Sequence, residues 1–461
     1  MKNIYLFFMC CCLIGFSGCK KFIDVNDNPN QPTNVKEGLM LAPAQVLISS
    51  TLYAGNVSNV VLQYMQVMAL NQVPPNVGTY LQFNVDMDAD WINFYTRTMN
   101  NLVVLSKQAE TNGNLNYSGI SKILTAYTLG LTTDLWGDVP FSESFLGIAN
   151  LKPKYDRQEE IYKQIQSLLD AGIADLSKNS GKTVGGDDFF YGGDVSKWTR
   201  LAYTLKARYY LHLTKAPGYN AAAQAQLALT ALEKGMVSHD DDFKMAYSGA
   251  AGEENPWQQN FISASTIILA STVVEGFKTR NDPRLTKMVA PATATGLYTG
   301  RVIGTADIGP LESYSRPAAF YGAAGAVNYL LNYSEALFLK AEASLLVSGV
   351  AVAAPVYREA VISHMTQLGV SSLAYDTYLA SRTLTADNAL QLIIEEKGIA
   401  GYLSMESFVD WRRTGFPVLS PSLNSKTAIP RRVLYPQVEL IANPQPQQGA
   451  KLTDRVWWDA N

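Results

Sequence analysis

The feature that most constrains the fold of this 461-residue chain is a series of stretches in which apolar residues recur at helical spacing. In the segment 118–134, one stripe holds Ile120, Leu124, Tyr127 and Leu131. Such spacing predicts amphipathic helices. The same pattern predicts helices over these segments: 35–69, 158–176, 196–212, 221–234, 328–346, 355–368 and 386–401.

The predicted helices follow one another in pairs, with small residues where the two members should cross. This arrangement is typical of tetratricopeptide-like packing, in which each pair buries its apolar face against the next. The spacing is irregular, and no tetratricopeptide consensus fits the segments. We therefore expect an all-α scaffold of degenerate helix pairs. With 47% hydrophobic and 17% charged residues, the chain can bury a full core, and we expect residues 35–461 to form one domain.

Two segments interrupt the helical pattern. The longer one, 236–327, has no sustained helical period and is rich in glycine, alanine, serine, threonine, proline and aromatic residues. The shorter one, 71–86, carries Pro74, Pro75 and Gly78 and is followed by Asp90, a predicted N-cap. Long irregular segments on a rigid scaffold usually bind something, so we expect ligand contacts here.

The first residues predict export and a lipid anchor. Lys2 precedes an apolar run from Ile4 to Phe16 that is long enough for a signal peptide and too short to span a bilayer. The sequence LIGFSGC at 13–19 resembles the lipobox of bacterial lipoproteins, although Phe16 stands where an aliphatic residue is usual. We therefore expect residues 1–18 to be a signal peptide and Cys19 to carry the lipids, among them palmitate. The alternative is an ordinary signal peptide with Cys19 as a free thiol.

The residues after Cys19 predict a tether. The segment 19–34 is polar and contains two prolines, which favours an extended chain. The other cysteines, Cys10, Cys11 and Cys12, lie in the signal peptide, so the mature chain has no disulfide and no cysteine zinc site. Its net charge of about −4 does not favour nucleic acid as a partner.

Four separated stretches resemble the SusD/RagB family of outer-membrane nutrient-binding lipoproteins. The first is the anchor with its tether. The second is TDLWGDVPFSE at 133–143 followed by PKYD at 153–156, and the third is NYSEA at 332–336 with KAEA at 340–343. The fourth joins IEEK at 394–397 to DWRRTGFP at 410–417, IPRR at 429–432 and YP at 435–436. The set and its order are more specific than any one stretch.

The resemblance implies an α-helical, SusD-like fold with four tetratricopeptide-like helix pairs, held at the cell surface on the outer membrane. It also implies a partner, a TonB-dependent, SusC-like transporter barrel, over which the protein acts as a lid. Family members capture oligosaccharides, or in some cases peptides, and are not enzymes. No cofactor and no metal is implied. The sequence does not identify the ligand or the transporter.

Aromatic residues make up 11% of the chain, more than a core of this size requires. Sugars present C–H groups on one face, so flat rings at the irregular segments suit them. The leading candidate for ligand contact is Trp257 in NPWQQN at 255–260. Further candidates from the two irregular segments and the early helix are Tyr314, Phe320, Tyr321, Tyr80 and Trp91. For each, packing in the core or in a loop is the alternative.

Other polar residues are better explained by structure. We expect Trp136 and Trp411 in turns between helices, and Asp134, Asp138 and Asp410 to cap helix ends or pair with Arg412 and Arg413. His212 ends an apolar face and is expected in the core. The loop 185–193, GGDDFFYGG, should form an aromatic knot that could touch a ligand or the transporter.

Three alternatives stay open. A glycoside hydrolase needs two carboxylates across a cleft, and Glu395 with Glu396, or Asp134 with Asp138, lie too close in sequence to face one another. A tetratricopeptide scaffold for another protein leaves the segment 236–327 unexplained. The alternating Asp86, Asp88 and Asp90 resemble the start of a calcium loop, but Trp91 and Arg97 stand where a glycine and a glutamate are needed.

Overall fold

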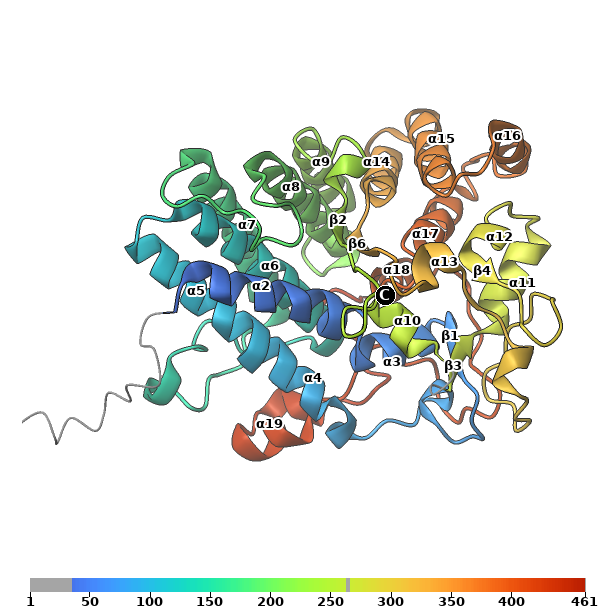
Figure 1. Cartoon of the computed structure of the whole chain (residues 1–461), viewed down its shortest axis with the longest axis horizontal. Helices are drawn as coiled ribbons and strands as arrows, with labels where there is room; N and C mark the ends of the chain where they lie inside the picture. Colours follow the sequence, from blue (N-terminus) through green and yellow to red (C-terminus); the bar gives the residue numbers. More distant parts are fainter. Residues whose placement is uncertain (1–34, 263–265, 461) are drawn as a thin grey trace, which may run out of the picture.

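The computed structural model describes residues 35–262 and 266–460, so Cys19 and the segment 19–34 lie outside the described residues. The fold is all-α (Figure 1). The helices of nine or more residues are α2 (Glu37–Leu47), α3 (Asn56–Tyr64), α5 (Asn100–Thr111), α6 (Leu115–Trp136), α7 (Gln158–Lys178), α8 (Val195–His212), α9 (Ala221–Leu232), α11 (Ser271–Thr279), α14 (Tyr333–Ser348), α15 (Val350–Gln367), α16 (Ser372–Ala380), α17 (Ala389–Ala400) and α18 (Glu406–Thr414). The shorter ones are α4 (Asp88–Ile92), α10 (Pro256–Asn260), α12 (Leu285–Met288), α13 (Ala319–Gly322) and α19 (Gln437–Ala442).

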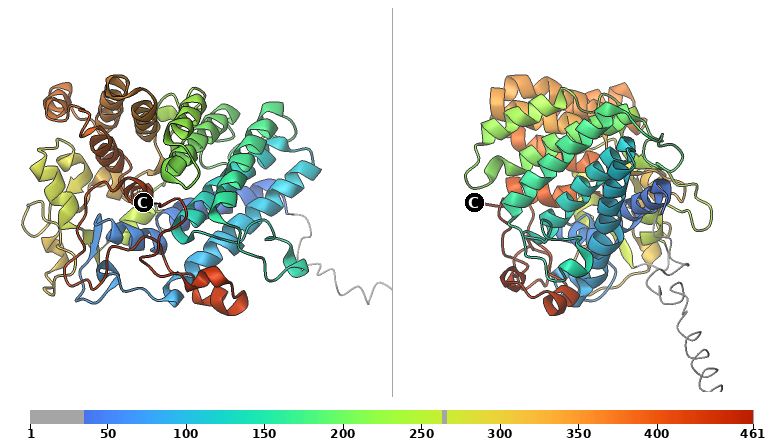
Figure 2. Two further views of the ribbon diagram at one scale, coloured as in Figure 1. Left: turned by 180° about the vertical axis from the view of Figure 1, so that it is seen from behind. Right: turned by 90° about the vertical axis from the view of Figure 1, so that its left-hand side faces the viewer.

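The predicted helix pairs are present. Helix α6 packs against α7, α8 against α9, and α14 against α15, while contacts of α7 with α8 and of α9 with α14 join the pairs into one series. Figure 1 shows this series running from α5 to α15, and Figure 2 shows it from behind and from one end. Gly119 and Gly172 lie where α6 and α7 cross, and a Cβ on Gly119 would come within 2.8 Å of the carbonyl oxygen of Gly172. Small residues therefore let these two helices approach closely.

Helix starts follow ordinary capping chemistry. The side chain of Asp194 accepts hydrogen bonds from the backbone N–H groups of Ser196 and Lys197 at the start of α8. Asp138 accepts one from the backbone N–H of Gln158 at the start of α7, at 2.8 Å. The predicted capping role of Asp138 is confirmed.

Three predictions about the helices are wrong. Asp90 does not begin a helix, because the chain is helical from Asp88 through a π-helical stretch, Asn93–Met99, to the end of α5. Its buried carboxylate instead accepts hydrogen bonds from Asn56 Nδ2 and Val57 N at the start of α3. The segment 328–346 begins as strand β6 (Asn328–Leu331), and Trp411 lies inside α18 rather than in a turn.

The segment 35–69 is also not one helix. A π-helical stretch, Ile48–Tyr53, and a break near Gly55 separate α2 from α3, and strand β1 (Met68–Leu70) follows. By length and composition Glu37–Tyr64 is apolar enough to cross a membrane, with a mean hydropathy of 1.2. In the structure Leu41, Ile48 and Leu52 are fully buried, which is how a core helix behaves.

The segment 236–327 is tied to the helical body by short antiparallel strand pairs. Strand β1 pairs with β3 (Ile267–Leu269), and β2 (Phe243–Met245) pairs with β6. A third pair, β4 (Val289–Ala290) with β5 (Arg316–Pro317), lies within the segment. The segment also contains α11, so the expectation of no sustained helix fails there. Figure 1 places α11 and α12 at the opposite end of the molecule from α5 and α7.

A network of buried charged side chains joins the later helices. We call it the ion-pair spine, and its members are Arg208, Glu335, Glu342, Lys397, Glu406, Asp410 and Arg413. The spine links α8, α14, α17 and α18. Arg413 contacts both Glu342 on α14 and, at 2.7 Å, Asp410 on its own helix. Lys397 contacts Glu406 and Asp410 at 3.1 and 3.0 Å.

The C-terminal residues close over the first helix pair. Trp458 is fully buried, and its Nε1 donates to Asp134 Oδ1 at 3.2 Å near the end of α6. The guanidinium of Arg412 lies 4.6 Å from the ring centre of Trp458 and 3.9 Å from that of Phe408. Asp459 pairs with Arg431 at 2.6 Å. The sequence motifs around 133–143 and 410–432 therefore meet in the interior.

Candidate functional site

The leading aromatic candidate, Trp257, is buried. Its exposed fraction is 2%, its Nε1 donates to Asn328 Oδ1 at 3.1 Å, and its ring packs edge-on against Tyr53. The cause is local. Asn255 caps α10 by accepting from the backbone N–H groups of Trp257 and Gln258, and this short helix directs the indole inward. The expectation that Trp257 presents a face to a ligand does not agree with this placement.

Three more candidates are also used in packing. Trp91 lies edge-on to Trp136, with ring centres 5.3 Å apart. The hydroxyl of Tyr80 accepts from the backbone N–H of Ser422 at 2.9 Å, and that of Tyr321 hydrogen-bonds His364 Nε2 at 3.2 Å. All three side chains are buried. These three side chains pack in the interior and do not present a free ring face to a ligand.

Tyr314 is different, because it is half-buried and lies where the two irregular segments meet. Strand β3 pairs with β1, and Leu269 in β3 also accepts from the backbone N–H of Arg301 and donates to the carbonyl oxygen of Ser315. These contacts bring the segment after residue 70 beside the segment 301–315. Asn71 Nδ2 donates to the carbonyl oxygen of Gly309 at 2.7 Å, which fixes one segment to the other. The guanidinium of Arg301 lies 6.0 Å from the Tyr314 ring centre, and its Nη1 reaches the Tyr314 hydroxyl at 3.3 Å. The Tyr314 ring therefore lies at this junction with the buried Arg301 guanidinium beside it. Val73 and Ile308, which lie near Asn71 and Gly309 in the sequence, are exposed.

Phe320 forms a second half-open aromatic surface. Its ring stacks on that of Tyr329 in β6 with centres 5.7 Å apart and an interplanar angle of 3°. Lys244, the cross-strand partner of Tyr329 in β2, places its ammonium 5.8 Å from the Tyr329 ring centre. Burial, with a contribution from Asp242, raises the pKa of Tyr329 to about 12, so the phenol is neutral at pH 7.

Sequence reasoning did not single out Tyr329 or Arg301. Tyr329 falls within a stretch predicted as helix, where its ring would be read as part of an apolar stripe. Its pairing with Lys244 depends on a strand that lies far earlier in the chain, at Phe243–Met245. Only Tyr329 of Asn328–Leu331 is partly exposed, and the four residues show no apolar–polar alternation that could have indicated a strand.

The three alternating aspartates do not converge on one point. Asp86 accepts from the backbone N–H of Phe83 at 2.8 Å, and Asp88 accepts from that of Val438 at 3.0 Å. Asp90 serves the start of α3, as described above. Among the residues that the structure describes, no group of three or more histidine, cysteine, aspartate or glutamate side chains is arranged to hold a metal ion.

The carboxylates considered for hydrolysis form ion pairs and hydrogen bonds within the protein. Glu396 is fully buried between Arg284 Nη2 at 2.7 Å and the Tyr378 hydroxyl at 2.5 Å. Its neighbour Glu395 pairs with Arg382 at 2.8 Å. Burial raises the pKa of Asp134, but this carboxylate accepts from the Tyr162 hydroxyl at 2.5 Å deep inside the molecule. These groups do not face one another across an open cleft.

Two further predictions concern residues that the structure places clearly. His212 is buried as expected, and hydrogen-bonds the Tyr162 hydroxyl and Glu406 at 2.9 Å each. In the loop 185–193, Phe190 packs on Phe243 with ring centres 4.4 Å apart, and Trp198 Nε1 donates to Asp188 at 2.7 Å. The predicted aromatic knot therefore exists.

Comparison with known proteins finds one matching family and several solved structures with the same fold. A family described as "Starch-binding associating with outer membrane" matches residues 29–436. No curated protein matches the chain. Among solved structures, a chitin-binding protein is 26% identical, with a TM-score of 0.80 over 92% of this chain and 100% of that one.

Two further structures share the fold. A SusD/RagB family protein from Bacteroides thetaiotaomicron is 24% identical, with a TM-score of 0.80 over 92% of this chain and 99% of that one. A chitin-binding SusD homologue from Flavobacterium johnsoniae is also 24% identical, with a TM-score of 0.79 and the same coverage of both chains.

Proposed function

The chain belongs to the SusD-like family, and from this premise we propose that it is a binding protein of the outer membrane that captures oligosaccharides and passes them to a TonB-dependent, SusC-like transporter. The family match, which extends over residues 29–436, is the observation that carries the proposal. The protein acts by binding rather than by catalysis. Lipids on Cys19 hold it to the membrane, and the segment 19–34 acts as its tether.

The ligand is a glycan in this proposal, with chitin and starch fragments as the first candidates. The family description refers to starch, and the 26% identical structure is that of a chitin-binding protein. Both polymers present apolar C–H faces with hydroxyls at the edge, which suits an aromatic ring flanked by polar groups.

Tyr314 is the proposed contact with the glycan. Its ring is half-buried, and Arg301 and the Asn71 contact to Gly309 hold the surrounding loops in place. Phe320, stacked on Tyr329, is the second proposed contact. Stacking of about 1 kcal/mol per ring supports dissociation constants in the micromolar to millimolar range, which suits a protein that must release its ligand.

Calorimetry on the chain from Lys20 onward tests the proposal. Maltohexaose and chitohexaose are titrated separately, and at least one should bind. Tyr314→Ala should weaken that binding about tenfold, which corresponds to about 1.4 kcal/mol. Tyr210→Ala removes a half-buried ring from α8 and is the matched control, with unchanged affinity expected.

If Tyr314→Ala and Phe320→Ala both bind the oligosaccharide with unchanged affinity and saturation, the proposed surface is contradicted. The assignment of a glycan ligand would still stand. Binding of peptides and of neither oligosaccharide would contradict the glycan assignment itself. Retention of the Cys19→Ser protein in the membrane fraction would contradict the anchor, and failure to co-purify a barrel transporter would contradict the proposed partner.

A further inference from the structure

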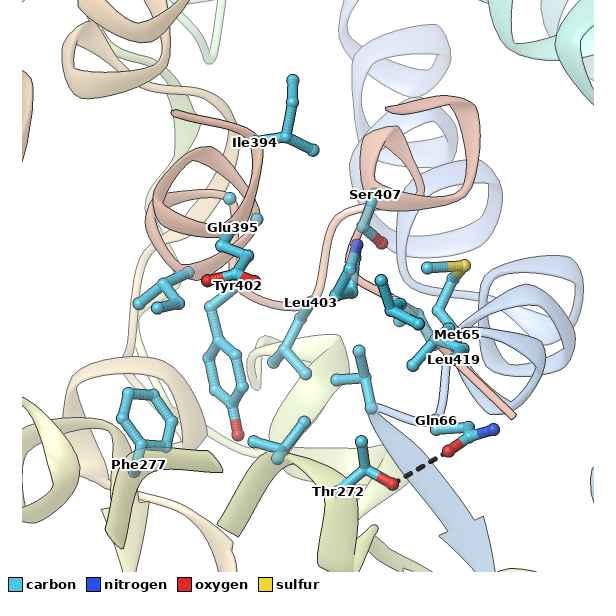
Figure 3. Close-up of a pocket in the computed structure, with 18 of the residues that line it drawn as sticks. Met65, Gln66, Thr272, Phe277, Ile394, Glu395, Tyr402, Leu403, Ser407 and Leu419 are labelled. Atoms are coloured by element: carbon cyan, nitrogen blue, oxygen red, sulfur yellow. Dashed lines mark hydrogen bonds between the residues drawn. The ribbon is translucent and has the colours of Figure 1, made fainter. Parts of the chain in front are cut away.

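A cavity of about 410 Å³ lies between α3, α11, α17 and the segment 417–419. Figure 3 shows its lining. The walls are mostly apolar, with Met65, Val273, Phe277 and Leu403 among them. Tyr314 and Phe320 are not part of the lining. Cavities of about 300–1,000 Å³ with apolar walls and a few polar groups are typical of small-molecule sites.

Tyr402 brings an unused hydrogen-bond donor to this cavity. The side chain is 8% exposed, and its hydroxyl has no hydrogen-bond partner in the described parts of the chain. Figure 3 shows the Tyr402 ring extending between Phe277 and Leu403. Burial raises the pKa of this phenol well above its usual value, so the hydroxyl keeps its proton at neutral pH. A buried donor without an acceptor is destabilising, and a bound acceptor would remove that cost.

Arg280 brings an unpaired cation. Within residues 35–262 and 266–460, its buried Nε has no hydrogen-bond partner and its guanidinium forms no direct ion pair, although its charge contributes to lowering the pKa of Asp282. The guanidinium folds back over α11. It lies 5.7 Å from the ring centre of Phe277 and close to Gly276, where a Cβ would come within 3.1 Å of Nη1.

The other polar groups on the wall are already engaged. Glu395, the carboxylate on the lining, pairs with Arg382 and accepts from Gln391 Nε2 at 2.8 Å. Gln66 accepts from Thr272 at 2.9 Å and donates to the carbonyl oxygen of Ser420. The unsatisfied chemistry of the cavity is therefore one positive charge and one hydroxyl donor beside an apolar volume.

We propose that this cavity binds a small amphipathic carboxylate, with an apolar body against the wall and its acid group served by Arg280. The Tyr402 hydroxyl donates to an acceptor atom of the same molecule. Charge complementarity selects an acid over a neutral molecule of the same shape, because Arg280 is the one cation on the described lining of the cavity. This site is separate from glycan capture and does not depend on it.

Octanoate and octan-1-ol are the probes, because they share an apolar chain and differ in charge. Calorimetry on the chain from Lys20, which contains every described residue, should show octanoate binding at least tenfold more tightly than octan-1-ol. Arg280→Gln should remove this preference by weakening octanoate about tenfold and leaving octan-1-ol unchanged. Tyr402→Phe should weaken octanoate by about threefold to fivefold.

Val273→Trp fills the cavity and should abolish binding of both probes. Circular dichroism and oligosaccharide binding should stay unchanged in all three variants, which separates loss of the site from loss of the fold. Equal affinity for the two probes overturns the proposal, as does octanoate binding that survives both Arg280→Gln and Val273→Trp. Absence of octanoate binding to the unchanged protein at millimolar concentration also overturns it.

Discussion

The ion-pair spine and the segment 236–327 are stabilised by different kinds of contact. In the spine, fully paired charges from α8, α14, α17 and α18 are enclosed by packed helices. In the segment 236–327, short strand pairs and buried rings such as Trp257 hold the loops, and other rings are left half-open. The spine defines the relative positions of the helices. The loops carry the half-open rings that we propose as ligand contacts.

This difference shows where sequence motifs are informative. The stretches that resemble the SusD/RagB family, such as DWRRTGFP at 410–417, supply Asp410 and Arg413 to the spine. The half-open rings Tyr314 and Phe320 lie in none of those stretches. The motifs therefore identify the scaffold, and they say little about which molecule it captures.

The largest expected effect comes from breaking the spine. Arg413→Met leaves Glu342 and Asp410 buried without this partner, and should lower the free energy of unfolding by about 3–5 kcal/mol. Urea denaturation followed by circular dichroism measures it. Arg358→Met removes a half-exposed ion pair with Asp376 and is the control, with a change below about 1 kcal/mol. Equal effects of the two variants would show that the spine is no more important than a surface pair.

A second prediction concerns acid. Although burial alone raises the pKa of Glu406, the cations Lys397 and Arg208 and the His212 ring hold it well below its usual value. Because the folded pKa is the lower one, ionised Glu406 stabilises the fold above about pH 4.5, and this contribution is lost as the pH falls. Glu406→Gln should therefore cost roughly 2–4 kcal/mol at pH 7 and progressively less between pH 5 and pH 3.

The same denaturation series at each pH measures this gap. Glu160→Gln, on the exposed side of α7, should change the free energy of unfolding by less than about 1 kcal/mol throughout. A gap between the unchanged protein and Glu406→Gln that stays constant from pH 7 to pH 3 would contradict the assigned role of Glu406.

The smallest expected change in stability concerns the buried rings of the segment 236–327. Trp257→Phe keeps an aromatic ring but removes the N–H group that donates to Asn328, and should lower the free energy of unfolding by about 1–2 kcal/mol. Oligosaccharide affinity should not change. A tenfold loss of affinity with unchanged stability would instead return Trp257 to the ligand surface and remove the distinction between buried and half-open rings.

The helix pairs could be predicted because their apolar stripes are local. In contrast, α18 buries the charged Asp410, Arg412 and Arg413 together with apolar residues, so its sequence pattern does not show which residues are inside. Arg413 can be buried because it donates a hydrogen bond to the carboxylate of Glu342, which lies 71 residues away in sequence. Strand β6 was not predicted for a similar reason, because its pairing partner β2 lies far away in the sequence.

The site was harder to predict than the fold. Trp257 is surrounded in sequence by asparagine and glutamine, which favoured an exposed loop, yet Asn255 and Asn328 find their partners inside the protein. Tyr314 remains a candidate because Arg301 and the loop after β1 hold it at the surface, an arrangement that depends on the β1–β3 pairing. Which rings are covered is decided by such long-range pairings, and composition does not record them.

The burial of Trp458 has a consequence for how the molecule comes into being. Its contact with Asp134 joins residues 324 positions apart, so the first helix pair lacks part of its interior until residue 458 has been synthesised. A chain that emerges N-terminus first stays incomplete for nearly its whole length, and contacts so distant in sequence form slowly. In a simple solenoid each repeat contacts only its neighbours, whereas here the first helix pair is joined to residue 458 as well.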